Sequence, residues 1–336
     1  MSDAGISPGP AETGRPAVTL RRWLWQAALP IALIVLLLGF GAFAPDVLSP
    51  TNLINIVQQT SYIALFAMAQ SVVILTRGFD LALGPTVSMV SVGTALAMAA
   101  AVAAGQPPVA VLLLGLGAGF GLGFACGLFN GIVVALLGVS PFVATLGSYN
   151  IAIGVATTLS GGRPVQGVPQ LFSDLFYGGR VFGLPMAIVF AVAVGIALEF
   201  VLRRTVYGRT LYIIGTNPRA AAVAGLPVKR ILVATYVLCS GLAALGAILL
   251  TARTGSGEPN LGGSLSLQAI AAAVVGGTSL AGGRGGVGTA VLGALFITIL
   301  SNGMNLTRID GYVQMVVLGA IVIVGVLIDR LRLGRH

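Results

Sequence analysis

The sequence predicts an all-α integral membrane protein with about ten transmembrane helices, and three observations lead to that fold class. Hydrophobic residues make up 57% of the 336-residue chain. Charged residues make up only 8%, whereas soluble domains carry about a quarter. The apolar residues gather into long segments with the few charges between them, which is the pattern of helices that cross a bilayer. The lipid bilayer is therefore the first predicted partner.

The chain begins with a segment, residues 1–20, that is rich in Gly, Pro and Ser and that we expect to be a disordered cytoplasmic tail. An arginine pair then precedes the first apolar segment, from Trp23 to Ala44. A cleaved signal peptide is the alternative here, because Ala42-Phe43-Ala44 fits a cleavage site of small residues. The segment is too long for a typical signal-peptide core and Pro45 follows it, so we favour a retained first span.

Nine further apolar segments complete the predicted membrane domain. They are Leu53–Thr76, Val87–Ala104, Val109–Leu137, Phe142–Ser160, Leu184–Leu202, Ile231–Thr251, Leu265–Leu280, Val287–Asn302 and Tyr312–Ile328. The segment Leu265–Leu280 is short and rich in glycine, which is typical of a broken or re-entrant helix. Residues 21–330 are thus predicted to form a single transmembrane domain, followed by a cytoplasmic C-terminal tail at 331–336.

The basic residues predict the orientation of the chain. With the N-terminus in the cytoplasm, fourteen of the eighteen Lys and Arg residues fall on the cytoplasmic side. The four on the other side are Arg163, Arg180, Arg253 and Arg308. Because cytoplasmic loops carry an excess of Lys and Arg, we expect both termini and residues 203–230 in the cytoplasm.

The segment 203–230 is the longest interruption in the apolar second half of the chain. It contains six basic residues and no acid: Arg203, Arg204, Arg209, Arg219, Lys229 and Arg230. A solvated basic loop is one interpretation. The other is a loop that docks a cytoplasmic partner, and a short helix with signals at both ends favours it.

That helix is predicted from Asn217 to Gly225. Asn217 is a good N-cap, and Pro218 suits the first helical position because its missing N–H has no partner there anyway. Gly225 suits the left-handed residue that ends a helix, and Pro227 prevents continuation. The predicted docking residues are Asn217, Pro218, Arg219, Ala220, Ala221, Ala222, Val223, Ala224 and Gly225. The alanines would let the helix lie close in a groove, so a bulky residue at Ala221 or Ala222 is expected to block docking.

Glycines recur every four residues along the fourth apolar segment, at Gly115, Gly119, Gly123, Gly127 and Gly131. That spacing places a stripe without side chains on one helix face, where another backbone can approach closely. We interpret the stripe as a packing surface.

Polar side chains inside the apolar segments are candidates for a translocation path, because an unpaired polar group in hydrocarbon is costly. The candidate residues, taken together with one aromatic neighbour, are Gln70, Asn130, Phe142, Thr145, Asn150 and Asn302. The polar ones are all neutral, and their amides and hydroxyls suit a neutral polyhydroxylated solute. Helix–helix hydrogen bonds are the alternative role, and we expect it for more than half of the polar residues in the spans.

Several classes of protein are excluded by what the chain lacks. There is no HExxH, GxSxG or P-loop pattern, and the sequence has only one His and two Cys, so neither a catalytic site nor a metal site is expected. The net charge of +9 forms no basic patch with interleaved aromatics, which argues against nucleic acid as a partner. No acidic or basic residue is expected near the membrane midplane, so energy for transport would enter from outside this chain.

Five stretches carry a resemblance to a known family. They are ILTRGFDLALG at 74–84, PFVATLG at 141–147, GTNPRAAAVAGLPVKR at 215–230, AIAAAVVGGTSLAGGRGGVGT at 269–289 and SNGMNLT at 301–307. Over about residues 50–330 the chain resembles the permease subunit of bacterial ABC importers, in the ribose and branched-chain amino acid permease family. The resemblance is closest to the monosaccharide branch, from which Arg77 and Phe79 depart. The family motif residues are Gly78, Asp80, Gly84, Gly276, Gly277, Gly282 and Gly283.

The resemblance implies a multi-pass protein of the bacterial cytoplasmic (inner) membrane and a set of partners. These are a second permease subunit, two cytoplasmic ATPase subunits that hold ATP and magnesium, and an extracytoplasmic solute-binding protein. The chain itself would bind no cofactor and would not be an enzyme. By the same resemblance, residues 217–225 look like the helix that couples the permease to the ATPase.

A pentose or hexose is the expected solute. A nucleoside or a branched-chain amino acid is the alternative within the same architecture. An ion-coupled secondary carrier and a purely structural membrane scaffold are alternatives from other classes. Transport without an ATPase would indicate the carrier, and the absence of any solute-dependent effect would indicate the scaffold.

Overall fold

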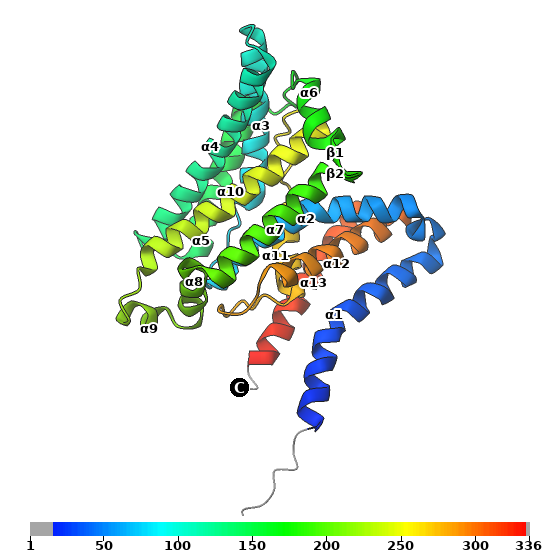
Figure 1. Cartoon of the computed structure of the whole chain (residues 1–336), viewed down its shortest axis with the longest axis vertical. Coiled ribbons are helices and arrows are strands. Elements are labelled where there is room, and N and C mark those ends of the chain that lie inside the picture. Colours follow the sequence, from blue (N-terminus) through cyan, green and yellow to red (C-terminus); the bar gives the residue numbers. More distant parts are fainter. Residues whose placement is uncertain (1–15, 334–336) are drawn as a thin grey trace, which may run out of the picture.

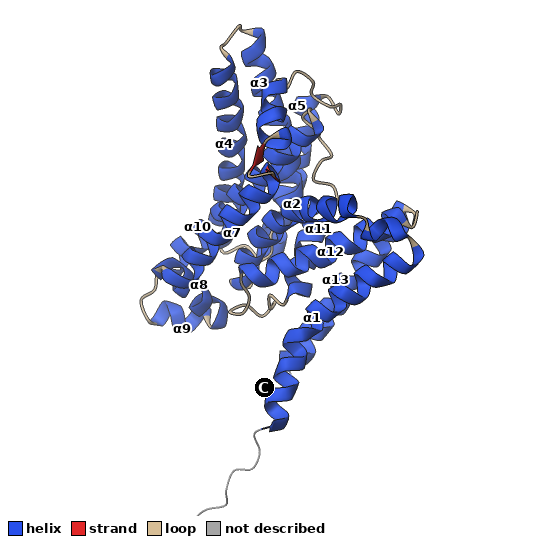
Figure 2. Ribbon diagram, turned by 45° about the vertical axis from the view of Figure 1, so that its right-hand side comes forward, coloured by secondary structure: helices blue, strands red, loops and turns tan. Residues whose placement is uncertain are grey.

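The computed structural model of the chain describes residues 16–333, and these residues are almost wholly helical (Figures 1 and 2). Each of the ten predicted apolar segments coincides with one helix, which confirms the predicted fold class. The ten helices are α1 (Pro16–Phe43), α2 (Pro50–Leu75), α3 (Leu83–Ala103), α4 (Pro108–Ala135), α5 (Pro141–Ser160), α7 (Met186–Arg204), α10 (Val228–Thr254), α11 (Leu265–Gly276), α12 (Val287–Leu306) and α13 (Gly311–Leu333).

Seven of these helices are long and apolar enough to cross a membrane by themselves: α3, α4, α5, α7, α10, α12 and α13. The helix α11 is not one of them, since it has 12 residues. At 1.5 Å per residue it extends only about 18 Å, against a hydrocarbon core of about 30 Å. The predicted interruption of the span Leu265–Leu280 is thus confirmed.

The chain before α11 is irregular, and it runs along α3. The amide of Glu258 donates to Ser91 Oγ at 3.1 Å, and the amide of Gly262 donates to Ser88 Oγ at 2.9 Å. The amide of Gly84, one turn further toward the start of α3, donates to Ser266 Oγ at 2.7 Å. Hydroxyls of α3 and α11 thus satisfy backbone amides that have no helical partner, which an irregular segment inside a membrane domain requires.

The core is built around α2. From Thr60 to Leu75 every residue of this helix except Ile63 is buried, so the helix is covered on all sides. It contacts α7, α10, α11 and α12, and its apolar side chains belong to the largest core cluster of the described residues. Helix α2 is therefore the central helix of the described residues.

The glycine stripe of α4 packs against α10 and α3, as predicted. All five stripe glycines are buried. A Cβ atom added at Gly127 would lie 2.6 Å from the carbonyl oxygen of Tyr236, and one at Gly131 would lie 2.9 Å from Cα of Val233. Such distances leave no space for any side chain, so the stripe sets how closely α4 and α10 can pack.

Short elements lie between the long helices. They are η1 (Pro45–Leu48), α6 (Gln170–Ser173), the π-helical turn η2 (Asp174–Gly178), a two-stranded antiparallel hairpin of β1 (Arg180–Val181) and β2 (Leu184–Pro185), α8 (Val206–Thr216) and α9 (Pro218–Val223). Figure 1 shows α8, α9 and the C-terminal end of α13 toward one end of the molecule, with α6 and the hairpin toward the other.

The predicted tails are shorter than expected where they can be described. Helix α1 already begins at Pro16, and α13 continues to Leu333. The rest of each predicted tail, residues 1–15 and 334–336, lies outside the described residues.

Candidate functional site

The predicted docking helix is present as α9, and its end signals act as expected. Asn217 Oδ1 accepts a hydrogen bond from the amide of Ala220 at 3.0 Å, and Pro218 occupies the first helical position. Gly225 has a φ of 76°, the left-handed conformation that a glycine adopts at little cost. The amide of Leu226 then donates to the carbonyl of Ala221 at 3.1 Å, which closes the end of the helix.

Ala221 and Ala222, which the sequence analysis treats as equivalent, differ in their exposure to solvent. Ala221 is fully buried, with 0% of its surface exposed, because it faces the rest of the protein. Ala222 is exposed and Val223 is 91% exposed. The expectation that a bulky residue at Ala221 would affect docking alone is therefore wrong, since it would first displace α9. Ala222 is the usable probe of this surface.

A second helix in the segment 203–230, α8, does not appear in the sequence prediction. Thr205 caps it by accepting a hydrogen bond from the amide of Gly208 at 3.2 Å. Its buried residues are Gly208, Thr210, Leu211, Ile214 and Gly215, so one face is covered. The cap and the three-to-four-residue spacing of Leu211, Ile214 and Gly215 are the signals that could have revealed it.

Two hydroxyls fix α8 to the membrane domain. Tyr207 Oη lies 3.1 Å from Thr235 Oγ1 on α10. Tyr212 Oη donates to the carbonyl of Gly285 at 2.9 Å, in the loop between α11 and α12. The segment is therefore a docked pair of short helices and not a solvated basic loop.

The C-terminal end of α8 meets two of the family's glycine motifs. A Cβ added at Gly215 would lie 2.0 Å from the carbonyl oxygen of Leu75 and 2.4 Å from the amide of Gly283. The amide of Gly283 donates to that same Leu75 carbonyl at 2.9 Å. Gly282 and Gly283 are both left-handed, with φ of 79° and 71°. Three segments far apart in the sequence therefore meet with no side chains between them.

The remaining glycines of these motifs also serve close approach or an unusual backbone. A Cβ at Gly276 would lie 2.0 Å from the carbonyl oxygen of Thr289, so this residue lets α11 and α12 touch. Gly277 ends α11 with a φ of 112°. A Cβ added at Gly84 would lie 2.4 Å from the carbonyl oxygen of Gly262, and one added at Gly78 would lie 2.9 Å from Tyr236 Oη.

Asp80 lies in the turn between α2 and α3, which we call the α2–α3 turn (residues 76–82), and its side chain is completely buried. Its Oδ1 accepts from the amide of Ala82 at 2.9 Å, and Oδ2 lies 3.8 Å from Sγ of Cys239. Burial raises the pKa of Asp80 to about 6, against the smaller opposite effect of the Ala82 hydrogen bond. Asp80 thus helps to hold the turn against α10.

Gln70, on α2, pairs with the backbone of the same turn. With its amide nitrogen and oxygen assigned from their partners, the side chain donates to the carbonyl of Asp80 at 3.2 Å and accepts from the Asp80 amide at 3.1 Å. Gln70 has no exposed surface. It braces the backbone of the turn.

Three other polar path candidates are buried among helices. Ser148 Oγ donates to Asn130 Oδ1, which joins α5 to α4, and Thr145 Oγ1 donates to the carbonyl of Pro141 at 2.8 Å. Asn302 and Asn52 exchange two amide hydrogen bonds, each 2.9 Å long, between α12 and α2. Phe142 and Asn150 are exposed on α5. The path role of all six candidates stays a prediction.

Exposed polar residues that the sequence analysis did not select lie on the irregular segment before α11 and on α11 itself. Asn260 and Ser264 are exposed, and Gln268 is half-buried. Gln268 Nε2 donates to Ser264 Oγ at 2.8 Å. The search for polar residues inside apolar segments missed the first two, because they precede the short helix.

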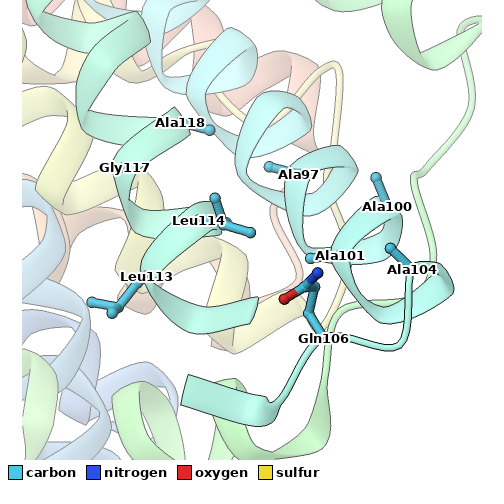
Figure 3. A pocket seen from close by; sticks show the side chains of 9 residues that line it. All are labelled: Ala97, Ala100, Ala101, Ala104, Gln106, Leu113, Leu114, Gly117 and Ala118. Atoms are coloured by element: carbon cyan, nitrogen blue, oxygen red, sulfur yellow. The ribbon is translucent and has the colours of Figure 1, made fainter. Parts of the chain in front are cut away.

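Two hollows on the protein lack the polar lining that a polar solute requires. The hollow in Figure 3, of about 590 Å³ between α3 and α4, is lined by Ala, Leu and Gly with Gln106 as its one polar side chain. Another, of about 580 Å³ between α2, α7 and α12, includes Thr60 and Ser61, whose hydroxyls already donate to carbonyls of their own helix. Its remaining polar side chain, Glu199, forms an ion pair with Arg203. Neither hollow resembles a sugar site.

Comparison with known proteins identifies the family. The family described as "Branched-chain amino acid transport system / permease component" matches residues 52–326, which is most of the chain. The chain belongs to this family. It is therefore a multi-pass membrane permease component, and the glycine motifs and α9 all lie within the matched residues.

Full-length relatives agree with the family assignment. The chain is 35% identical to a probable ABC transporter permease protein of Sinorhizobium fredii, over 100% of this chain and 98% of the relative. It is 37% identical to the ribose import permease protein of Escherichia coli, over 92% of this chain and 95% of the relative. It is 33% identical to the D-allose transport system permease protein of Escherichia coli, over 90% of each chain. No solved structure matches the chain.

Proposed function

We propose that this permease component is the membrane-spanning subunit of an ATP-driven ABC importer, and that it translocates a monosaccharide, a pentose or a hexose. The observation that carries the proposal is α9. It is a six-residue helix with a cap at each end and an exposed outer face, and it contacts α8 and α10. A helix this short is not stable in water on its own, so its order indicates a surface built for a partner.

The kind of solute follows from the relatives and from the polar residues. The relatives named above include permeases for ribose and for D-allose. The candidate path residues are neutral amides and hydroxyls, which pair with sugar hydroxyls without desolvating a charge. The family description names branched-chain amino acids, which makes them the alternative solute.

The proposed assembly contains the partners that the energy source requires. Two ATPase subunits would dock on α9 and its counterpart in a second permease subunit, and they would hold the ATP and magnesium. A solute-binding protein would deliver the sugar from the opposite side. This chain would then bind no cofactor and catalyse no reaction.

Reconstitution tests the solute and the energy source together. The chain would be placed in liposomes with its cognate ATPase and binding protein, and uptake of labelled ribose, allose, leucine and a nucleoside would be measured. We expect uptake of one of the two sugars that requires ATP and all three components. Uptake by the chain alone under a proton or sodium gradient would contradict the proposal, and ATP-dependent uptake of leucine would change the solute class only.

The docking surface is tested by Ala222→Trp. Ala222 is exposed on α9, so the large side chain should prevent the ATPase from docking while leaving the membrane fold intact. The measurements are co-purification with the ATPase and solute-stimulated ATP hydrolysis. Ala104→Trp is the matched control, because Ala104 is an exposed alanine at the end of α3, on the opposite side of the protein. If both variants bind the ATPase equally, α9 is not the docking element.

The proposed orientation places α9 in the cytoplasm and the β1–β2 hairpin outside. Phe182 at the tip of the hairpin is fully exposed and Val223 on α9 is 91% exposed, so both positions are accessible to a reagent. In a chain without Cys126 and Cys239, Phe182→Cys should react with an impermeant thiol reagent in intact cells. Val223→Cys should react only after the membrane is opened, and the reverse pattern would invert the topology.

A further inference from the structure

Arg77 has a backbone conformation that is unusual for an arginine. It follows the end of α2 with a φ of 64°, in the left-handed region where residues with a Cβ atom are rarely found. A glycine would occupy this position with less strain. The arginine side chain must therefore contribute something that offsets the strain.

The guanidinium of Arg77 binds the end of α8. Its Nε donates to the carbonyl of Gly215 at 2.6 Å, and its Nη2 donates to the carbonyl of Thr216 at 2.5 Å. These are the last two residues of α8, whose carbonyls have no partner within the helix. A positive charge also interacts favourably with the C-terminal end of a helix.

Asn217, the cap of α9, is the next residue after Thr216. The Arg77 side chain thus holds the junction between α8 and α9 from the α2–α3 turn. The stem of the side chain lies against Gly282, where an added Cβ would come within 2.6 Å of Arg77 Cγ. Glycine at 282 leaves the room that this position of the arginine requires.

The α2–α3 turn is in turn connected to the interior. Ser266 Oγ on α11 donates to the carbonyl of Leu81 in the turn at 2.8 Å. It also accepts from the amide of Gly84 on α3, and the amide of Gly283 donates to the carbonyl of Leu75 at the end of α2. Helix α3, which starts at this turn, is the helix along which the irregular segment before α11 runs. A displacement of the α8–α9 junction would therefore reach α2, α3 and the exposed polar residues near α11.

We propose that Arg77 is a positioning residue that transmits movement of α9 to the α2–α3 turn. The inference rests on the proposed role of α9 as the ATPase docking helix. With Arg77 in place, a push on α9 moves α2 and α3 as one unit. Without it, the junction yields and ATP hydrolysis proceeds without moving the helices that line the solute's route.

The glycine variant isolates this role from folding. Arg77→Gly removes both hydrogen bonds but also relieves the backbone strain, so the protein should fold and still co-purify with the ATPase. In liposomes with the ATPase and binding protein, the number of sugars taken up per ATP hydrolysed should fall by about tenfold, the size of a typical coupling between sites. Arg77→Lys, which keeps a charge that can reach one carbonyl, should restore part of that ratio.

Arg308→Gly is the matched control. Arg308 is exposed, has a φ of 58° and follows the end of α12, so its replacement removes the same charge from the same backbone conformation. Its ratio of uptake to hydrolysis should equal that of the unmodified protein.

The outcomes separate this inference from the proposed function. An unchanged ratio for Arg77→Gly would overturn the inference. Loss of ATPase binding by Arg77→Gly would also overturn it, since Arg77 would then act in docking and not in transmission. If Arg77→Gly does not fold, Arg77→Lys takes its place in the test. An unchanged ratio of uptake to hydrolysis in Arg77→Lys would then overturn the inference as well. Failure of the role of α9 itself would instead appear as normal ATPase binding by Ala222→Trp.

Discussion

The glycine stripe of α4 and the glycines of the loop between α11 and α12 use the same residue for different purposes. Stripe glycines have ordinary helical backbone, and they are required because α3 or α10 lies where a side chain would be. Loop glycines such as Gly282, Gly283 and Gly285 have positive φ, and most of them also have another segment within van der Waals distance. The stripe holds two long helices rigidly together, whereas the loop allows three irregular segments to meet beside α9.

The difference matters for function because the stripe of α4 and the junction near α9 should respond differently to a mechanical push. Packing along α4 involves many contacts over the length of a helix, so it resists movement as a whole. The junction near α9 depends on a few hydrogen bonds, among them those of Arg77 and Gly283. The junction near α9 should therefore yield more easily to a push on α9 than the packing along α4 does.

The largest expected effect is from breaking the stripe. Gly127→Leu places a Cβ 2.6 Å from the carbonyl oxygen of Tyr236, so α4 and α10 would have to separate. We expect a loss of more than about 3 kcal/mol of stability, beyond the usual cost of overpacking. Gly117→Leu is the control, since no atom lies within 4 Å of its Cβ position. The yield of monodisperse protein in detergent measures both, and equal yields would show that the stripe is not an interface.

A smaller effect is expected from a change in the loop, Gly283→Ala. The added Cβ would lie 2.6 Å from Thr216 Oγ1, and the φ of 71° is strained for alanine. Strain and crowding together should cost about 2 kcal/mol. Thermal unfolding measures that cost, and solute-stimulated ATP hydrolysis should fall further than the stability loss explains. Unfolding as severe as that of Gly127→Leu would contradict the distinction between the regions.

A still smaller effect is expected at Gly225, where strain acts alone. Its φ is 76°, but nothing lies within 4 Å of its Cβ position. Gly225→Ala should therefore cost about 1 kcal/mol, confined to the end of α9. Hydrogen exchange of the α9 amides should quicken while that of α4 and α10 stays the same. A global loss of protection would show that the end of α9 is coupled to the whole fold.

The smallest effect is expected at Gly117, with the opposite sign. This glycine lies on α4 off the stripe and in open space, so alanine relieves the entropic cost of a helical glycine. Gly117→Ala should raise stability by about 0.5 kcal/mol. A small increase in the melting temperature would support the view that only the stripe glycines of α4 are there for packing.

Local signals in the sequence determined most of the fold. Runs of apolar residues predicted the ten helices, and the four-residue spacing from Gly115 to Gly131 predicted a packing face on α4, though not the helices that it contacts. Asn217, Pro218 and Gly225 gave α9, because a helix cap depends on residues within one turn of it. These features need no knowledge of the rest of the chain.

Tertiary structure alone decided which residues meet. Residues from separate parts of the chain come together in the contact of Leu75, Gly215 and Gly283 and in the pairing of Asn52 with Asn302. The burial of Ala221 likewise depends on the rest of the protein. The sequence could not show that Gln70 pairs with the backbone of Asp80, because the shape of that turn is not specified locally. A side chain shows its own chemistry in the sequence, but the group that satisfies it is placed by the folding of the whole chain.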